Sequence, residues 1–243
     1  GLRFLGYPTR SVEIRANSAI NIALWDLKAQ AAAQPLYQYL GGPVRDKIRI
    51  YNTCASSGYN WTSGNRRAQI ADRDIDMVSS PSDDLIWQET DPGGLALSLL
   101  EEGITAMKIW PFDRAAESSG GQSISSSEMD HALSRIGAIR DAVGNRVDIL
   151  MEYHSLWHQV TAQRILREVD AYAPFWHEDP IAMEDLQGLA ELRDMSSTPI
   201  AGSESHGTVT WVRDAIAARA VDYINFDIGW VGGLSEALRV SHY

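Results

Sequence analysis

Cysteine and long apolar stretches are scarce in this 243-residue chain, and each scarcity excludes a class of protein. The single cysteine, Cys54, cannot form a disulfide within the chain, so a disulfide-stapled fold is excluded. No apolar stretch approaches the ~20 residues of a membrane span or resembles a secretory signal. We therefore expect a soluble protein of a reducing compartment, the cytoplasm.

Positive charge is also in short supply. The sequence has 21 lysines and arginines against 32 acidic residues, a net charge of −11, and no run of basic residues. Nucleic acids and anionic membrane surfaces attract clustered basic side chains. Neither is therefore an expected partner.

Three glutamates stand out in the second half of the chain because each follows a short apolar run. Glu178 follows Glu152 by 26 residues, and Glu204 follows Glu178 by the same interval. Amphipathic segments at 159–172 and 183–195 lie between them, so each interval is predicted as a strand, a turn, a helix and a second turn. Parallel strands joined by right-handed crossovers present equivalent ends at one face of a sheet. The three carboxylates are therefore predicted to converge.

Converging carboxylates repel one another and raise one another's pKa unless a cation lies among them. A divalent metal ion is the simplest such cation. The alternative is that these are three solvated loop acids, which would be the better interpretation for any one of them alone. The metal is favoured because Glu178 stands with Asp179 before Pro180, where the restricted backbone can aim a side chain reproducibly.

The first part of the chain predicts a helix, a strand and a long loop. The helix is expected over 17–40 with Ser18 available as its cap, and the glycines and proline at 41–43 end it. Alternation over 47–53 predicts a strand. The loop from 54 to about 91 is interpreted as a segment that covers substrate; the alternative is a surface excursion packed by its own aromatic residues.

Repeated strand and helix patterns over the rest of the chain predict a barrel. Helices are expected at 95–102, 209–218 and from a capping box at Ser125 and Glu128 to Val143. Six strands are expected in all, near Ile50, Met107, Leu150, Phe175, Ile200 and Ile224. A closed barrel of this type normally has eight. We therefore expect a single barrel-like unit that is cut short.

At this point the chain resembles the mandelate racemase and muconate-lactonising branch of the enolase superfamily. The segment 18–27 (SAINIALWDL), followed by 35–37 (PLY) and 40–42 (LGG), resembles the helical end of that family's capping domain. Its active-site series is similar to Lys108 after a strand, Glu152, Glu178 within Glu-Asp-Pro, Glu204 after Gly202, and Asp227 ahead of Gly232-Gly233. The resemblance implies the end of an α+β capping domain over 1–45. It further implies a (β/α) barrel of the TIM type over 46–243, with its first six strands.

The resemblance also implies a chemistry. In this family Mg²⁺ holds the substrate carboxylate, a base removes the proton α to it, and the metal stabilises the enediolate. Glu152, Glu178 and Glu204 would be the metal ligands, and hard oxygen donors suit Mg²⁺. The first ligand is more often aspartate in the family, and Glu152 keeps the donor type.

The strand that carries the family's base departs from the usual pattern. It commonly has the sequence Lys-x-Lys, whereas here it is Lys108-Ile109-Trp110. Either Lys108 acts at the site itself or it is a structural lysine paired to a carboxylate. Proton abstraction could also fall to the opposite face, where the family pairs an aspartate at the position of Asp227 with a histidine one strand later, beyond Tyr243.

Two histidines follow predicted ligands by two residues. His154 would lie on the same side as Glu152 in a strand extension. It resembles the acid that protonates the leaving hydroxyl in sugar-acid dehydratases of the superfamily; the alternative is a hydrogen-bonded histidine at the barrel mouth. His206 follows Glu204, and we predict that it and Trp110 contact substrate, with structural packing as the alternative for both.

The run Lys-Ile-Trp-Pro-Phe-Asp at 108–113 and Glu-Tyr-His-Ser-Leu-Trp at 152–157 most resemble the acid-sugar members. We therefore predict dehydration of a sugar acid to a 2-keto-3-deoxy acid by a homo-oligomeric enzyme. Alternatives are a cycloisomerase of an anhydro-sugar acid and, less favoured, a racemase or epimerase. From other classes come a metal-independent barrel glycosidase, which uses a carboxylate pair, and a non-catalytic barrel.

Overall fold

The computed structural model describes residues 12–55 and 83–243. It divides into two compact units. We call Ile50–Pro180 the central unit, and Gly1–Arg49 with Ile181–Tyr243 the terminal unit. Each is described by itself.

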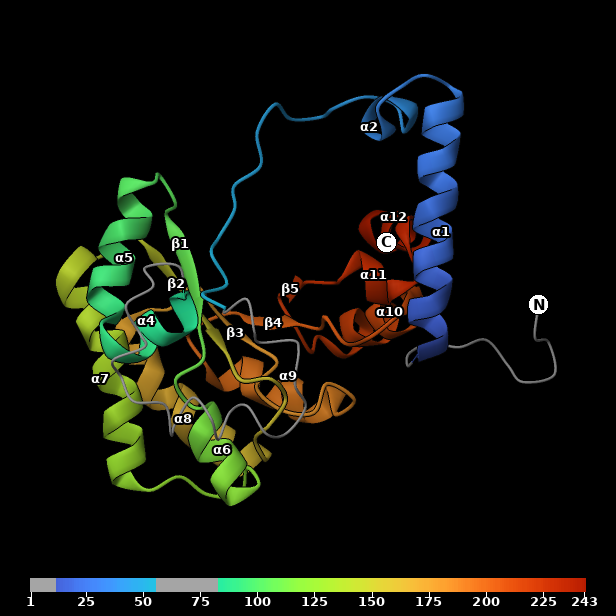
Figure 1. Cartoon of the computed structure of the whole chain (residues 1–243). Coiled ribbons are helices and arrows are strands. Elements are labelled where there is room, and N and C mark those ends of the chain that lie inside the picture. Colours follow the sequence, from blue (N-terminus) through green and yellow to red (C-terminus); the bar gives the residue numbers. More distant parts are fainter. Residues whose placement is uncertain (1–11, 56–82) are drawn as a thin grey trace. The chain divides into compact units, whose positions relative to one another are not determined.

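Three parallel strands form the middle of the central unit (Figure 1). They are β1 (Ala106–Ile109), β2 (Asp148–Glu152) and β3 (Trp176–Glu178). Lys108 is opposite Leu150 in the register of β1 and β2, and Glu152 is opposite Glu178 in that of β2 and β3. The strands are almost wholly buried, as expected for parallel strands covered on both faces. The two glutamates therefore end neighbouring strands.

Helices of the central unit cover these strands. They are α4 (Asp84–Thr90), α5 (Pro92–Glu101), α6 (Asp113–Ser119), α7 (Ser126–Val143), α8 (Gln159–Val169) and the 3₁₀ helix η2 (Asp170–Tyr172). α5 lies along α7 (Figure 1). The predicted capping box is confirmed: Ser125 Oγ accepts from the Glu128 backbone N at 3.2 Å, and the Glu128 carboxylate accepts from the Ser125 backbone N at 2.8 Å.

The terminal unit contains a pair of parallel strands and six helices among its described residues. The strands are β4 (Ile200–Gly202) and β5 (Tyr223–Ile224), and the helices are α1 (Val12–Ala31), α2 (Leu36–Tyr39), α9 (Leu186–Met195), α10 (Thr208–Ala218), α11 (Ile228–Val231) and α12 (Leu234–His242). α1 lies beside α11 and α12 (Figure 1). Val212, Val231, Ala237 and Val240 form a buried apolar cluster. None of the helices described in either unit is long and apolar enough to cross a membrane.

The predicted helix over 17–40 is wrong in its bounds. The chain forms two helices because Ala33 adopts a left-handed backbone, with φ of 51°, and Pro35 follows. Ser18 is not a cap. It is buried inside α1, where its hydroxyl donates to the Ile14 carbonyl at 2.8 Å and accepts from the Gly232 backbone N at 3.0 Å.

The predicted strand over 47–53 is also wrong, because only Asn52 pairs with β1. Its backbone N donates to the Ala106 carbonyl at 3.0 Å and its carbonyl accepts from the Lys108 N at 2.7 Å. Ile48 and Ile50 are largely exposed, so no buried face supports the alternation. The loop expected over 54–91 is corrected at its end, where α4 forms with Asp83 as its cap. Most of the segment predicted to cover substrate, residues 56–82 of 54–91, lies outside the described residues, so that interpretation stays a prediction.

Candidate active site

A buried lysine lies between two buried glutamates at the ends of β2 and β3. Lys108 Nζ is 2.9 Å from Glu152 Oε2 and 2.9 Å from Glu178 Oε1. The exposed fractions of Lys108, Glu152 and Glu178 are 6%, 2% and 1%. The lysine is brought there by β1, which is the neighbour of β2. The structure thus brings together three of the residues predicted for the site.

The other oxygens of the two carboxylates are held by donors close by in sequence. Glu152 Oε1 accepts from the backbone N of Tyr153 at 3.0 Å and of His154 at 2.8 Å. Glu178 Oε2 accepts from the indole N–H of Trp176 at 3.1 Å. Trp176 was missed by the sequence analysis, although its place two residues before Glu178 puts it on the same strand face. These bonds fix the direction in which both carboxylates point.

One ammonium does not fully balance the two carboxylates. Burial disfavours the charged form of Lys108, but the charges of Glu152 and Glu178 raise its pKa above the usual range. Burial and the charge of Glu152 raise the pKa of Glu178 to about 7, even though Lys108 opposes this shift. With both carboxylates ionised, the cluster carries one more negative charge than positive charge. Its hard oxygen donors and that excess charge fit a divalent ion such as Mg²⁺.

The third predicted ligand, Glu204, belongs to the terminal unit. It is half-buried in the segment after β4. Within 12–55 and 83–243, no group of three or more histidine, cysteine, aspartate or glutamate side chains is arranged to hold a metal ion. A site made by Glu204 together with Glu152 and Glu178 therefore stays a prediction.

His154 is paired with an aspartate that the sequence analysis missed. Its Nδ1 is 2.9 Å from Asp113 Oδ2, and Asp113 is buried at the start of α6. Burial lowers the pKa of His154, but the hydrogen bond and charge of Asp113 outweigh burial and raise it. The available signal was the position of Asp113 at the end of the segment 108–113, directly after the turn that follows β1.

The backbone positions His154 differently from the expectation. β2 ends at Glu152, and His154 and Ser155 adopt left-handed conformations with φ of 50° and 57°. A tight turn therefore places the imidazole, and the predicted strand extension is wrong. The bond from the His154 backbone N to Glu152 Oε1 keeps this turn at the carboxylate. Residues other than glycine seldom have a positive φ, and those that do often lie at functional sites.

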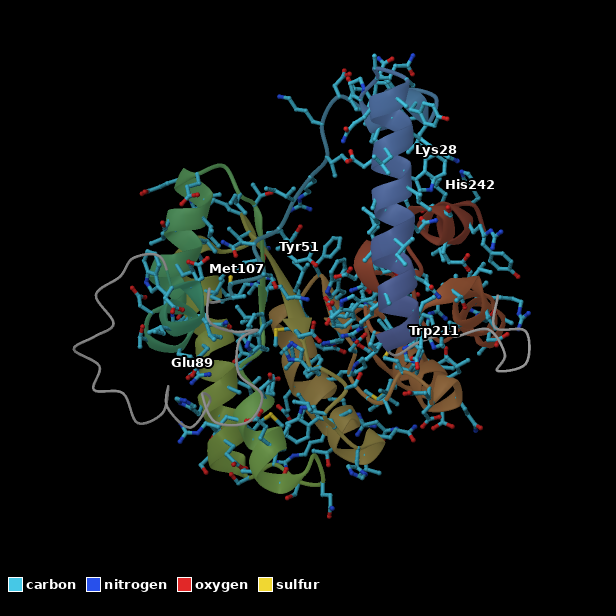
Figure 2. All side chains as sticks on the ribbon, turned by 45° about the vertical axis from the view of Figure 1, so that its right-hand side comes forward. Lys28, Tyr51, Glu89, Met107, Trp211 and His242 are labelled. Carbon is cyan, nitrogen blue, oxygen red and sulfur yellow. The ribbon has the colours of Figure 1, made fainter. Side chains whose placement is uncertain are left out.

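Trp110 borders this pair. Its ring meets that of His154 edge-on with centroids 5.5 Å apart, and it is only 7% exposed. The ring centroid of Tyr51, which is labelled in Figure 2, is 5.9 Å from Lys108 Nζ. Aromatic rings thus lie near both Lys108 and His154. A substrate contact by Trp110 stays a prediction.

The predicted site residues of the terminal unit have other surroundings. His206 Nδ1 is 3.0 Å from Ser203 Oγ, and its ring stacks on that of Trp211 from α10, with centroids 5.0 Å apart. Asp227 caps α11, where its Oδ1 accepts from the Gly229 backbone N at 2.6 Å. Asp227 is exposed and His206 is largely buried. Their predicted roles in catalysis and substrate binding are not tested by these contacts.

Comparison with known proteins gives the family. The sequence model described as "Enolase C-terminal domain-like" matches residues 94–243, which is more than half of the chain. The model of the "Mandelate racemase / muconate lactonizing enzyme, N-terminal domain" matches residues 5–41. The chain belongs to the mandelate racemase and muconate-lactonising branch of the enolase superfamily. The predicted family is therefore confirmed, whereas the boundary expected near residue 45 stays a prediction.

Solved structures of the family share its fold. An enolase of the mandelate racemase subgroup from Agrobacterium tumefaciens is 39% identical, with a TM-score of 0.81, over 98% of this chain and 55% of that one. Together with the parallel strands and covering helices, this likeness confirms the predicted α/β barrel of the TIM type.

Curated relatives include sugar-acid dehydratases. The D-gluconate dehydratase of Thermoproteus tenax is 30% identical over 227 residues, covering 93% of this chain and 39% of that protein. The D-mannonate dehydratase of Rhizorhabdus wittichii is 30% identical over 234 residues, covering 95% of this chain and 54% of that protein. The chain thus spans about half the length of the curated relatives that it matches.

Proposed function

We propose that this chain carries the metal-binding and acid-catalytic part of a Mg²⁺-dependent sugar-acid dehydratase. The observation that carries the proposal is the buried cluster of Lys108, Glu152 and Glu178 next to the paired His154 and Asp113. The relatives named as D-gluconate and D-mannonate dehydratases support the same reaction class. A soluble homo-oligomer acting on a small carboxylate substrate stays our expectation.

Glu152 and Glu178, with Glu204 as the predicted third ligand, would hold Mg²⁺. When bound, the ion supplies positive charge where negative charge develops on the substrate carboxylate, an effect worth several kcal/mol. The two glutamates are held in place by the backbone and indole donors already described, so little reorganisation is required of them.

We assign Lys108 a cationic role in place of a basic one. A lysine can take up the substrate's α-proton only when its amine is neutral, and the two carboxylates favour its charged form. Its ammonium holds the carboxylates and adds positive charge beside the substrate. Abstraction of the α-proton is then assigned to the side of Asp227, which would orient the base.

His154 is assigned as the general acid. Its Nδ1 faces Asp113, so we assign its opposite nitrogen, Nε2, to proton transfer. The base takes the α-proton, the C–O bond at the β-carbon breaks, and the hydroxyl leaves as water with the proton from His154. The resulting enol rearranges to the 2-keto-3-deoxy acid. Hydroxide is too poor a leaving group to depart without that proton.

A panel of sugar acids tests the proposal. The full chain is incubated with Mg²⁺ and D-gluconate, D-mannonate, other six-carbon aldonates and an anhydro-sugar acid, and 2-keto acid is measured. We expect a product lighter by one water from an aldonate, and no product after chelation with EDTA. A 2-keto product of unchanged mass from the anhydro-sugar acid alone would favour the cycloisomerase. Aryl glycosides are assayed in parallel, and their cleavage in the presence of EDTA would overturn the metal-dependent assignment.

A further inference from the structure

A second polar cluster lies behind the two glutamates. Tyr153 directly follows Glu152 and His177 directly precedes Glu178, so alternation along the strands turns these two side chains away from the carboxylates. Both are fully buried, at 0% exposure. The Tyr153 hydroxyl is 2.8 Å from His177 Nδ1, and His177 Nε2 is 3.0 Å from Asp170 Oδ1. Asp170 belongs to η2, the turn that leads from α8 toward β3.

The direction of these hydrogen bonds follows from the groups involved. The Asp170 carboxylate can only accept, so His177 Nε2 carries a hydrogen. Nδ1 of the neutral ring then accepts from the Tyr153 hydroxyl. Every bond in this line has one donor and one acceptor. A buried polar network that is satisfied in this way fixes one geometry, because any shift leaves a buried polar group unpaired.

The network acts where the strand pairing ends. Beyond Glu152 the chain leaves β2 for the left-handed turn at His154, and the last backbone bonds across to the next segment are Tyr153 N to the Glu178 carbonyl, 3.1 Å, and Ser155 N to the Asp179 carbonyl, 2.7 Å. The Tyr153–His177 bond adds a side-chain link between the same two segments. It therefore joins the two residues that are covalently adjacent to the glutamates.

We infer that Tyr153, His177 and Asp170 are positioning residues that set the separation of the Glu152 and Glu178 carboxylates for the metal ion. This inference rests on the proposed function. The side chains of the cluster touch neither the carboxylates nor, in our assignment, the substrate; the direct contact is the bond from the Tyr153 backbone N to Glu152 Oε1. It acts through the backbone of β2 and β3, so its effect is expected on metal affinity as well as on stability.

The test compares two variants that each remove one buried hydroxyl. Tyr153→Phe deletes the bond to His177. Thr161→Val is the matched control, since Thr161 is also buried in the central unit and its hydroxyl donates to the Gln122 carbonyl at 2.8 Å, away from the glutamates. Mg²⁺ affinity is measured by calorimetry and unfolding by urea titration, on the full chain.

We expect Tyr153→Phe to weaken Mg²⁺ binding by about 10-fold, which is within the usual loss of metal affinity when a residue that supports a metal ligand is mutated. Thr161→Val should leave affinity within about twofold while lowering the urea midpoint to a similar extent as Tyr153→Phe. Asp170→Asn, which keeps an acceptor for His177, should fall between them. Equal Mg²⁺ affinity in Tyr153→Phe and Thr161→Val would overturn this inference but not the proposed function. Absence of Mg²⁺ binding in the unaltered chain would overturn the proposed function as well.

Discussion

The two sides of the paired strands β2 and β3 differ in how their polar groups are satisfied. On one side two carboxylates share a single ammonium, and burial together with the charge of Glu152 raises the pKa of Glu178. On the other side Tyr153, His177 and Asp170 form a line in which donors and acceptors match. The unbalanced side can accept a further cation, whereas the balanced side has nothing to exchange. The side with Lys108, Glu152 and Glu178, which we call the charged side, therefore suits the binding of a metal ion. The side with Tyr153, His177 and Asp170 suits structural support of the two glutamates.

Replacing His154 by Asn should give the largest loss of activity, because it removes the proposed general acid next to Lys108, Glu152 and Glu178. We expect kcat for dehydration to fall by about 10²- to 10⁴-fold, the usual contribution of general acid catalysis. Exchange of the substrate's α-proton with solvent deuterium should persist, since proton abstraction precedes departure of the hydroxyl. Both rates are followed by NMR in D₂O, with His158→Asn as an exposed control. A parallel loss of exchange and dehydration would move the acid role elsewhere, with His206 the first residue to examine.

Replacing Lys108 by Met should destabilise the protein, because it leaves the negative charges of Glu152 and Glu178 without their cation. Two buried carboxylates would lose their cation, which typically costs about 3–5 kcal/mol of unfolding free energy. Added Mg²⁺ should restore part of that loss, because a ligand that binds only the folded state stabilises it. Urea titrations with and without Mg²⁺ measure both effects, and Lys28→Met is the exposed control (Figure 2). Stability equal to that of the control would show that the lysine bridge contributes nothing.

Replacing Asp113 by Asn should have a smaller effect, because it leaves His154 in place but weakens the bond that orients it. Hydrogen bonds to charged groups contribute about 1.5–3 kcal/mol, which corresponds to roughly 10- to 100-fold in kcat. KM for the sugar acid should change little. Steady-state kinetics beside an Asp130→Asn surface control check this split. A rise in KM at constant kcat would instead place Asp113 in substrate binding.

The sequence predicted those parts of the site that depend on regular structure. Glu152 and Glu178 meet because both end strands of a regular βα repeat, and their even spacing is visible without a structure. The same alternation predicts that His177 turns away from Glu178. The sequence does not decide between a catalytic and a structural role for Lys108, since no spacing rule says which carboxylates a strand lysine will reach.

The remaining features depend on irregular backbone or on packing. Asp113 meets His154 only because α6 begins after a short turn that follows β1, and because a left-handed turn follows β2. Serine is a common residue at the start of a helix, but α1 begins before Ser18 and buries its side chain. The strand predicted over 47–53 lacks a buried face, so its alternation has no partner to stabilise it. Local pattern alone does not determine these outcomes.

We propose above all that the cluster of Lys108, Glu152 and Glu178 binds one Mg²⁺. Calorimetric titration of Mg²⁺ into the folded chain and into its Glu178→Gln variant is the most direct test. Glutamine keeps the size and one oxygen of the side chain but removes the charge that the ion requires. We expect one bound Mg²⁺ per unaltered chain and none in the variant, with both proteins folded by circular dichroism. Equal Mg²⁺ affinity in the two proteins would contradict it.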